Sequence, residues 1–338
     1  MELYCGIDLH STRSWIAILD KEMSVVKQAK FDNDLGTIVG FLEPYRSEMA
    51  GIAVESTYNW YWLVDGLMDA GHRVHLTNTN ASQQYKGLKY LDDRHDARWL
   101  AKMLCLGILP EGYIQPREDR AIRDLLRRRA FLVQKKVSLL LAMRGAFECR
   151  TGLRSSSKEM KKWTPAEIEA VVTDEAAALG ITCLIKPVQA ISEQIASLEK
   201  EALKRGKLRE EFTLLKTVWG IGDILGLTIM YEVGDISRFR KVGDFASYCR
   251  CVKSDWRTNG KPKGSGNTKN GNPHLSWAFS EAAHFAVCHY ERARRYKQRK
   301  QAKTKAIVAI RALAHKLARA SYWVMKRHEP FDPDRLFS

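Results

Sequence analysis

The beginning of the chain places an acidic side chain at the end of an apolar strand. The run Leu3–Ile7 predicts a buried β-strand, and Asp8 ends it with no basic neighbour before Arg13. Burying a carboxylate without compensation is costly, so we expect this side chain to meet a cation. Asp8 is therefore the first candidate site residue.

Two further stretches carry acids in comparable places. The apolar run Gly51–Val54 ends in Glu55, and Asp93 and Asp96 stand three residues apart, on one side of a helix if they open one. With Asp8, these four carboxylates can converge on one point. Oxygen ligands without a His or Cys cluster suit Mg²⁺ or Mn²⁺ rather than zinc, and such ions position phosphoryl groups. The alternative is structural, since such acids also cap helices and stabilise helix dipoles.

The charge balance indicates a polyanionic partner. The 338 residues include 55 Lys and Arg against 39 Asp and Glu, a formal net charge of +16. That excess favours nucleic acid. Long apolar runs and a basic signal-peptide start are both missing, so we expect no membrane partner and a cytoplasmic location. The seven cysteines are scattered and contain no C-x-x-C pair, which argues against a disulfide framework or a zinc module.

The order of predicted elements indicates an α/β region followed by helices. Three strands between residues 3 and 31 precede alternating helices and strands, in the order βββαβαβα. This order is typical of a ribonuclease-H-like mixed sheet, so the predicted fold class is α/β plus α. We expect three domains: residues 1–115 as the ribonuclease-H-like catalytic domain, 116–212 as basic helices with a coiled-coil arm, and 213–338 as a mostly helical C-terminal domain.

The middle of the chain predicts a helical arm. Residues from Arg117 to about Arg150 are helical and strongly basic, and 154–158 indicate an exposed linker. Apolar residues then recur at intervals of three and four, the seam of a coiled coil: Ile181, Leu184, Val188, Ile191, Ile195, Leu198 and Ala202. We expect this seam to pair with a partner chain, with packing inside its own domain as the alternative.

Three features of the C-terminal region predict contacts with nucleic acid. Gly220-Ile221-Gly222 lies between helices and can offer backbone N–H groups to a phosphate, as in helix-hairpin-helix DNA binders, although tight helix packing is an alternative. The stretch 249–272 predicts a loop around a phosphate backbone or a solvated loop, and a helix from Glu291 to about Lys326 carries dense cations. The nucleic-acid-binding residues we expect are Gly220, Gly222, Arg257, Lys261, Lys263, Lys269, Arg294 and Arg295.

Together these stretches resemble the DEDD-type insertion-sequence transposases, a family of bridge-RNA-guided recombinases. The resemblance covers nearly the whole chain and rests on Gly6-Ile7-Asp8, Glu55-Ser56-Thr57-Tyr58, Asp93-x-x-Asp96-Ala97-Arg98-x-Leu100-Ala101, Gly220-Ile221-Gly222, and Gly264 through Asn272. It implies four acids that bind Mg²⁺ on a resolvase-like fold, a coiled-coil arm, and a serine that links covalently to DNA. It also implies a composite active site between protomers, oligomers up to a tetramer, and a non-coding RNA that selects DNA by base pairing.

The chain departs from the family at the nucleophile. By its spacing to Gly264, the family's serine falls on Thr258. Threonine has the hydroxyl but adds a methyl group that crowds attack on a phosphodiester. Ser254 is the rival nucleophile in the same stretch. Three alternatives are open: Thr258 attacks, Ser254 attacks, or the chain is impaired in strand cleavage.

The function that we expect is DNA recombination by an insertion-sequence transposase. Metal ions held by the four acids would neutralise charge on the scissile phosphate while a loop hydroxyl attacks. The expected partners are DNA, a guide RNA and further copies of the chain in a dimer or tetramer. The alternatives are a metal-dependent nuclease resembling Holliday-junction resolvases, in which the acids activate water, and a nucleic-acid-binding protein without enzymatic activity.

Overall fold

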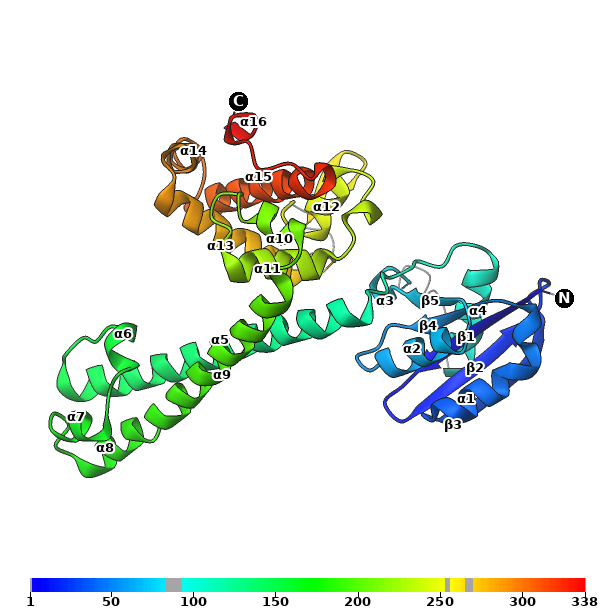
Figure 1. Ribbon diagram of the computed structural model, residues 1–338, viewed down its shortest axis with the longest axis horizontal. Coiled ribbons are helices and arrows are strands. Elements are labelled where there is room, and N and C mark those ends of the chain that lie inside the picture. Colours follow the sequence, from blue (N-terminus) through cyan, green and yellow to red (C-terminus); the bar gives the residue numbers. More distant parts are fainter. Residues whose placement is uncertain (1, 83–92, 253–255, 265–269, 338) are drawn as a thin grey trace. The chain divides into compact units, whose positions relative to one another are not determined.

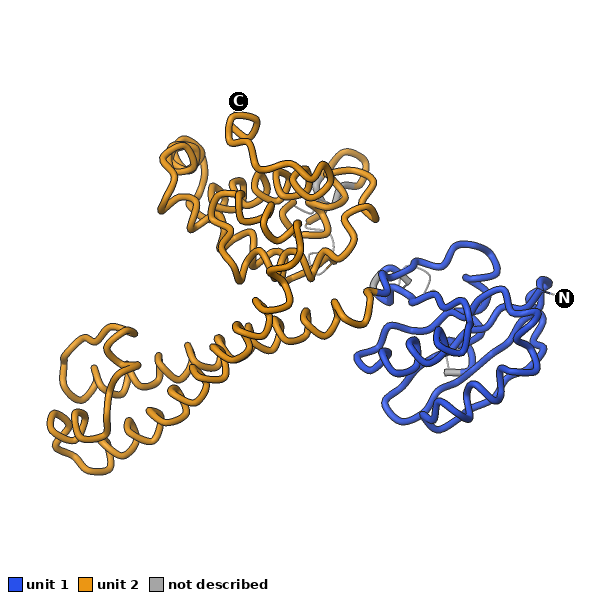
Figure 2. The backbone as a smooth tube through the Cα atoms, in the orientation of Figure 1, with its two compact units in different colours: residues 1–114 blue, residues 115–338 orange. Residues whose placement is uncertain are grey.

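The computed structural model describes residues 2–82, 93–252, 256–264 and 270–337, and it divides into two compact units, residues 1–114 and 115–338 (Figure 1, Figure 2). The elements of the first unit are β1 (Leu3–Leu9), β2 (Arg13–Leu19), β3 (Val25–Asp32), α1 (Leu35–Leu42), the 3₁₀ helix η1 (Glu43–Glu48), β4 (Met49–Glu55), α2 (Tyr61–Asp69), β5 (Val74–Thr77), α3 (Thr79–Ser82) and α4 (Asp93–Cys105).

The first unit contains a mixed five-stranded sheet with the strand order β3-β2-β1-β4-β5. β1, β2 and β3 are antiparallel neighbours, whereas β4 pairs in parallel with both β1 and β5. The mixed sheet predicted from the order of elements is confirmed. β1 lies at its centre, and its apolar composition fits a strand covered on both faces.

The two faces of the sheet bury different residues, because side chains alternate along a strand. Cys5 and Ile7 of β1 belong to the core that α1 and α2 complete with Ile38 and Leu63. On the opposite face, Ala53 of β4 packs with apolar residues of α4. The face against α4 is therefore also the face of Gly6 and, two residues on, of Asp8.

Helix α4 approaches β1 so closely that the strand has no room for a side chain at Gly6. A Cβ atom there would lie 2.1 Å from the carbonyl oxygen of Ala97 and 2.6 Å from the amide nitrogen of Ala101. Both atoms belong to the helix backbone, which cannot move away as a flexible side chain can. The glycine therefore fixes the contact between helix and strand.

We expect Gly6→Ala to destabilise the first unit by about 1–3 kcal/mol or more, because the added methyl group overpacks a backbone contact. The measurement is hydrogen exchange of peptides that cover residues 3–19, in the full chain. Gly40→Ala is the matched control, since a Cβ at Gly40 meets nothing within 4 Å and the site lies inside α1. That change should stabilise by about 0.5–1 kcal/mol. Equal protection in Gly6→Ala and wild type would contradict the contact.

The second unit is mostly helical. Its elements are α5 (Arg117–Thr151), α6 (Ser157–Met160), α7 (Pro165–Glu169), α8 (Glu175–Thr182), α9 (Ile185–Gly206), α10 (Glu210–Leu215), α11 (Asp223–Val233), the 3₁₀ helix η3 (Ile236–Arg238), α12 (Val242–Tyr248), β6 (Trp256–Thr258), β7 (Lys261–Gly264), α13 (Pro273–His289), α14 (Glu291–Gln301), α15 (Ala306–Arg327) and α16 (Pro333–Phe337).

Helices α5 and α9 pack along each other and form an arm (Figure 1). Val188 of the predicted seam lies in the core at the tip with Met143 of α5, and Ala202 lies in the core at the base with Leu126. Ile195 between them is buried as well. These seam residues therefore pack against α5 of the same chain, as in the alternative, and not against a partner chain, as we expected.

Two expectations for the second unit can be compared with the structure. The stretch 154–158 is mostly exposed, as expected, but it is part of the arm tip, because the Ser156 side chain caps α6, which ends at the buried Met160. The single helix expected from Glu291 to about Lys326 is wrong in extent, because α14 and α15 are separate. Cations crowd the break between them, and the Thr304 hydroxyl donates to the carbonyl oxygen of Lys300. That bond competes with helix continuation.

Candidate functional site

Asp8 and Glu55 stand at the ends of two adjacent parallel strands. The last paired residues of β1 and β4 are Ile7 and Val54, and each acid follows its paired residue directly. Both acids lie two residues beyond a position that faces α4, at Gly6 and Ala53, so both face that helix. The side chain of Asp8 is 2% exposed, whereas Glu55 is partly buried.

The first turn of α4 lies at the same end of the sheet. The guanidinium carbon of Arg94 lies 4.8 Å from the centroid of the Trp15 ring, and Trp15 pairs with Asp8 in the sheet. At the other end of the helix, Leu104 approaches Gly51, near the start of β4. The helix therefore runs antiparallel to β1. Its opening residues, which include Asp93 and Asp96, lie over the strand ends that carry the other two acids.

His10 is a residue of this site that sequence reasoning missed. Its Nε2 lies 3.0 Å from Oδ2 of Asp8, while its own carbonyl oxygen accepts hydrogen bonds from the side chains of Asn33 and Asn59. These contacts hold the turn after β1 in place. The signal in the sequence was an imidazole two residues beyond the acid, a position that returns to the same side of an extended chain.

The donor set fits a hard divalent cation. The candidate ligands are carboxylates, which suit magnesium or manganese. Cys5 lies on the opposite face of β1, and complete burial raises the pKa of its thiol, so it supplies no thiolate for zinc. Within the described part of the chain, no group of three His, Cys, Asp or Glu side chains is spaced to hold a metal ion. The Asp93 side chain lies outside that part.

The second candidate region is a β-hairpin. β6 and β7 are antiparallel, and Asn259 and Gly260 connect them with φ values of 52° and 75°. Positive φ at both turn residues is typical of the tight hairpin turn that Asn-Gly favours. The sequence contains this Asn-Gly pair, but we expected a loop over the whole stretch and did not predict the hairpin. Thr258 is exposed beside this turn. Lys261 and Lys263 of β7 are exposed too.

The side chains of three predicted site residues in this region lie outside the described part of the chain. Ser254 and Lys269 lie outside the described residues, and the side chain of Arg257 is not described. The choice between Thr258 and Ser254 as nucleophile therefore stays open.

An ion pair with a buried carboxylate anchors the segment that carries the hairpin. Glu232 of α11 is 3% exposed and forms two bonds with Arg127 of α5, at 2.6 and 2.8 Å. The side-chain amide of Asn272 donates to the same carboxylate at 2.6 Å, and its oxygen caps α13. Next to it, Gly271 has a φ of +89°, and a Cβ there would lie 2.5 Å from the carbonyl oxygen of Tyr248. The arm, α11 and the end of the hairpin segment are thus joined.

We expect Glu232→Gln to destabilise the second unit by about 1.5–3 kcal/mol at pH 7, because it removes charge-assisted hydrogen bonds. Burial by itself would raise the pKa of Glu232, but the hydrogen bonds and charge of Arg127, together with Asn272, outweigh it, and the pKa lies below its usual value. This stability is present above the unfolded-state pKa of about 4.3 and is lost as the pH falls through the lower folded-state value.

The measurement is urea unfolding of wild type and variant across the acid range. Glu193→Gln is the control, because Glu193 lies exposed on α9. The difference between wild type and Glu232→Gln should shrink below about pH 4. A difference that does not depend on pH would show that the carboxylate charge contributes nothing.

The predicted phosphate-binding residues fall into different surroundings. Gly220 has a φ of +82°, and a Cβ there would lie 2.0 Å from the carbonyl oxygen of Ala282, so close packing explains this glycine. Gly222 caps the start of α11 and its Cβ position is open. Arg294 donates to the last carbonyl groups of α13, and Arg295 pairs with Glu291. Both arginines are exposed.

Comparisons with known proteins find two family models and two curated relatives that match this chain. A family model of DEDD transposases of the IS110 type matches residues 5–148, and one described as the transposase IS116/IS110/IS902 family matches residues 212–298. The transposase for insertion sequence element IS1111A of Coxiella burnetii is 22% identical over 204 residues, 59% of this chain and 55% of that protein. The putative transposase y4qE of Sinorhizobium fredii is 24% identical over 232 residues, 67% and 55% of the two chains.

The mixed sheet and these matches place residues 5–148 in the DEDD class of transposase domains. The chain belongs to the IS110 family of insertion-sequence transposases. It spans about half the length of the curated relatives that it matches. In the part of the chain that the structure describes, no helix is long and apolar enough to cross a membrane.

Proposed function

We propose that the chain cleaves and rejoins DNA strands in a reaction that depends on a divalent metal ion. One observation carries the proposal: Asp8 and Glu55 end adjacent strands on the face covered by α4, whose first turn brings two more acids to that end. A DEDD family match over residues 5–148 includes all four positions.

The acids would hold Mg²⁺ or Mn²⁺, which supplies Lewis-acid stabilisation of the scissile phosphate worth several kcal/mol. Asp8 would serve as the inner ligand, since it is almost fully buried on a central strand. The imidazole of His10, 3.0 Å from the carboxylate, would fix the orientation of that side chain. Glu55, Asp93 and Asp96 would complete the set from the neighbouring strand and from the first turn of α4.

A hydroxyl of the hairpin segment is the proposed nucleophile. The oxygen of Thr258, or of Ser254, would attack phosphorus, so that a new O–P bond forms as the bond to the leaving 3′ oxygen breaks and that oxygen takes up a proton. The phosphodiester bond is conserved in the protein–DNA link and is available for rejoining. The exposed position of Thr258 beside Lys261 suits an approaching phosphate.

The partners proposed are DNA, a guide RNA and further copies of the chain. The net charge of +16 supports a polyanionic partner. The helix-hairpin-helix contact would use the open N-terminus of α11 at Gly222. For self-association, the arm offers exposed apolar side chains on α5 at Phe131, Val137 and Leu141. The proposed division into residues 1–115, 116–212 and 213–338 follows from these roles.

Neutralising the acids should abolish strand cleavage while DNA binding persists. We expect Asp8→Asn and Glu55→Gln to lower the cleavage rate by about 10³-fold or more, because several kcal/mol of charge stabilisation is lost. The measurement is metal-dependent cleavage of labelled DNA, with binding followed by fluorescence anisotropy. Glu22→Gln in the exposed turn before β3 is the control and should cleave as wild type does. Unchanged cleavage in Asp8→Asn would favour a binding protein whose acids are structural.

The nucleophile can be identified from the covalent product. On a denaturing gel, a hydroxyl nucleophile leaves DNA that migrates with protein. If Thr258 attacks, Thr258→Val removes this band, because valine keeps the shape without the hydroxyl, and Thr258→Ser strengthens it by removing the crowding methyl group. If Ser254 attacks, Ser254→Ala removes it instead. Clean 5′-phosphate ends without the band would identify a hydrolytic nuclease.

A further inference from the structure

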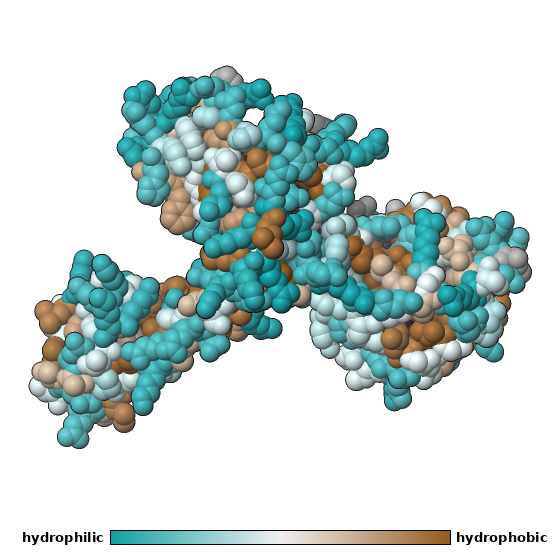
Figure 3. Space-filling model, in the orientation of Figure 1, coloured by the Kyte–Doolittle hydropathy of each residue, from teal (hydrophilic) through white to brown (hydrophobic). Residues whose placement is uncertain are grey.

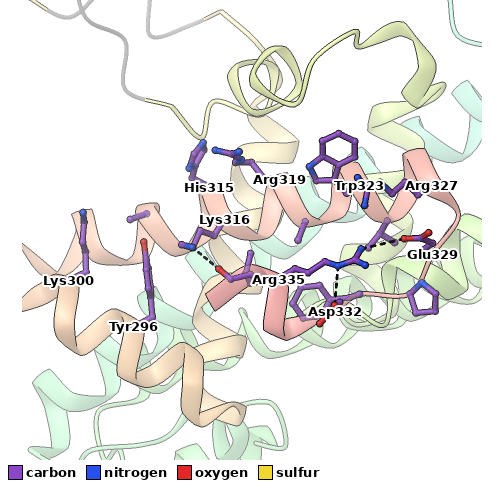
Figure 4. A pocket seen from close by; sticks show the side chains of 16 residues that line it. Tyr296, Lys300, His315, Lys316, Arg319, Trp323, Arg327, Glu329, Asp332 and Arg335 are labelled. Carbon is purple, nitrogen blue, oxygen red and sulfur yellow. Dashed lines mark hydrogen bonds and ion pairs between the residues drawn. The ribbon is translucent and has the colours of Figure 1, made fainter. Parts of the chain in front are cut away.

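A groove of about 680 Å³ runs along α15 in the second unit (Figure 4). Its floor is α15, and its sides are α14 with Tyr296 and Lys300, and the segment from Glu329 to Leu336. This volume falls within the range of about 300–1,000 Å³ that small-molecule sites occupy. None of the residues proposed above for metal binding or strand cleavage lines the groove.

Four side chains at four-residue intervals follow the groove on α15: His315, Arg319, Trp323 and Arg327 (Figure 4). This spacing places them on one side of the helix. Trp323 is 41% exposed, and the guanidinium carbon of Arg327 lies 4.5 Å from the centroid of a Trp323 ring. The opposite side of α15 is buried in the core, for example at Leu317. Trp323 therefore presents part of a large aromatic ring to the groove.

The charge of the groove is positive. Its two acids, Glu329 and Asp332, both pair with Arg335 at 3.7 and 3.2 Å. Lys300, Arg319 and Arg327 are exposed in the same groove, while Lys316 is partly buried and donates to the carbonyl oxygen of Leu336. On the face seen in Figure 3, hydrophilic side chains predominate where α14 and α16 lie.

We propose that this groove binds a single-stranded polynucleotide, with one unpaired base on Trp323 and the adjacent phosphates on Arg319 and Arg327. Aromatic rings alternating with cations suit a single strand, because its bases expose faces that a duplex keeps stacked. DNA and RNA share this chemistry. The inference rests on the proposed function, which requires strands to separate, and adds a site for one of them.

The test measures the affinity of full-length protein for a short labelled strand, as DNA and as RNA, and for the duplex of the same sequence. Trp323→Ala should weaken single-strand binding by about 5- to 150-fold and leave duplex binding nearly unchanged. Trp323→Phe should restore most of the affinity. Trp277→Ala is the matched control, because Trp277 is 38% exposed on α13 and does not line the groove.

Salt dependence separates stacking from phosphate contact. Arg319→Ala should reduce the slope of log affinity against log salt by about 0.7 for a single strand, whereas Trp323→Ala should leave it unchanged. Tighter binding of one of the two polymers identifies the source of the strand. Equal losses for single strand and duplex would overturn the proposal, as would binding of an acidic peptide that competes with the strand and ignores Trp323.

The same preparations are assayed for metal-dependent cleavage. If wild type cleaves DNA and Asp8→Asn does not, yet Trp323→Ala binds single strands as tightly as wild type, the groove assignment fails and the proposed function stands. If Trp323→Ala weakens single-strand binding but wild type cleaves nothing, the groove assignment stands and the proposed function fails.

Discussion

The contact between α4 and β1 at Gly6 fixes where the candidate metal-binding acids of the first unit lie. Because the backbone of Ala97 and Ala101 occupies the place of a side chain, the helix and the central strand meet at one fixed point. Asp8 lies two residues further along the strand, and Asp96 directly precedes Ala97. A contact between two backbones resists local rearrangement, which would suit the proposed role of these carboxylates in holding an ion against their mutual repulsion.

In the second unit, a buried carboxylate and its hydrogen bonds fix the position of the hairpin segment. A hairpin that carries the proposed nucleophile would need a fixed base, and Asn272 can provide it through Glu232 and Arg127. The carboxylate is buried, so removing one partner would leave the others with unmet hydrogen-bonding demand. Since Arg127 belongs to the arm, the arm and the base of the hairpin segment are joined by this carboxylate as well as by the apolar core.

The regular spacing of apolar residues along strands and helices made much of the first unit predictable from the sequence. The strand ending at Glu55 and the helix before it were evident because apolar residues recur with the period of each element. Contacts that depend on tertiary packing were not: the intramolecular partner of the α9 seam lies on α5, and the break before Ala306 has no Gly or Pro to mark it. The same holds for the candidate site. Asp8 could be recognised from the sequence, but its contact with His10 depends on the conformation of the turn after β1, which the sequence pattern does not predict.

We propose that the carboxyl ends of β1 and β4 bind a divalent ion in the protein itself. Isothermal titration calorimetry with Mn²⁺ on the full chain, without nucleic acid, tests this most directly. We expect wild type and Glu22→Gln to bind Mn²⁺ with equal affinity and Asp8→Asn to lose this binding. Equal Mn²⁺ affinity in wild type and Asp8→Asn would contradict it.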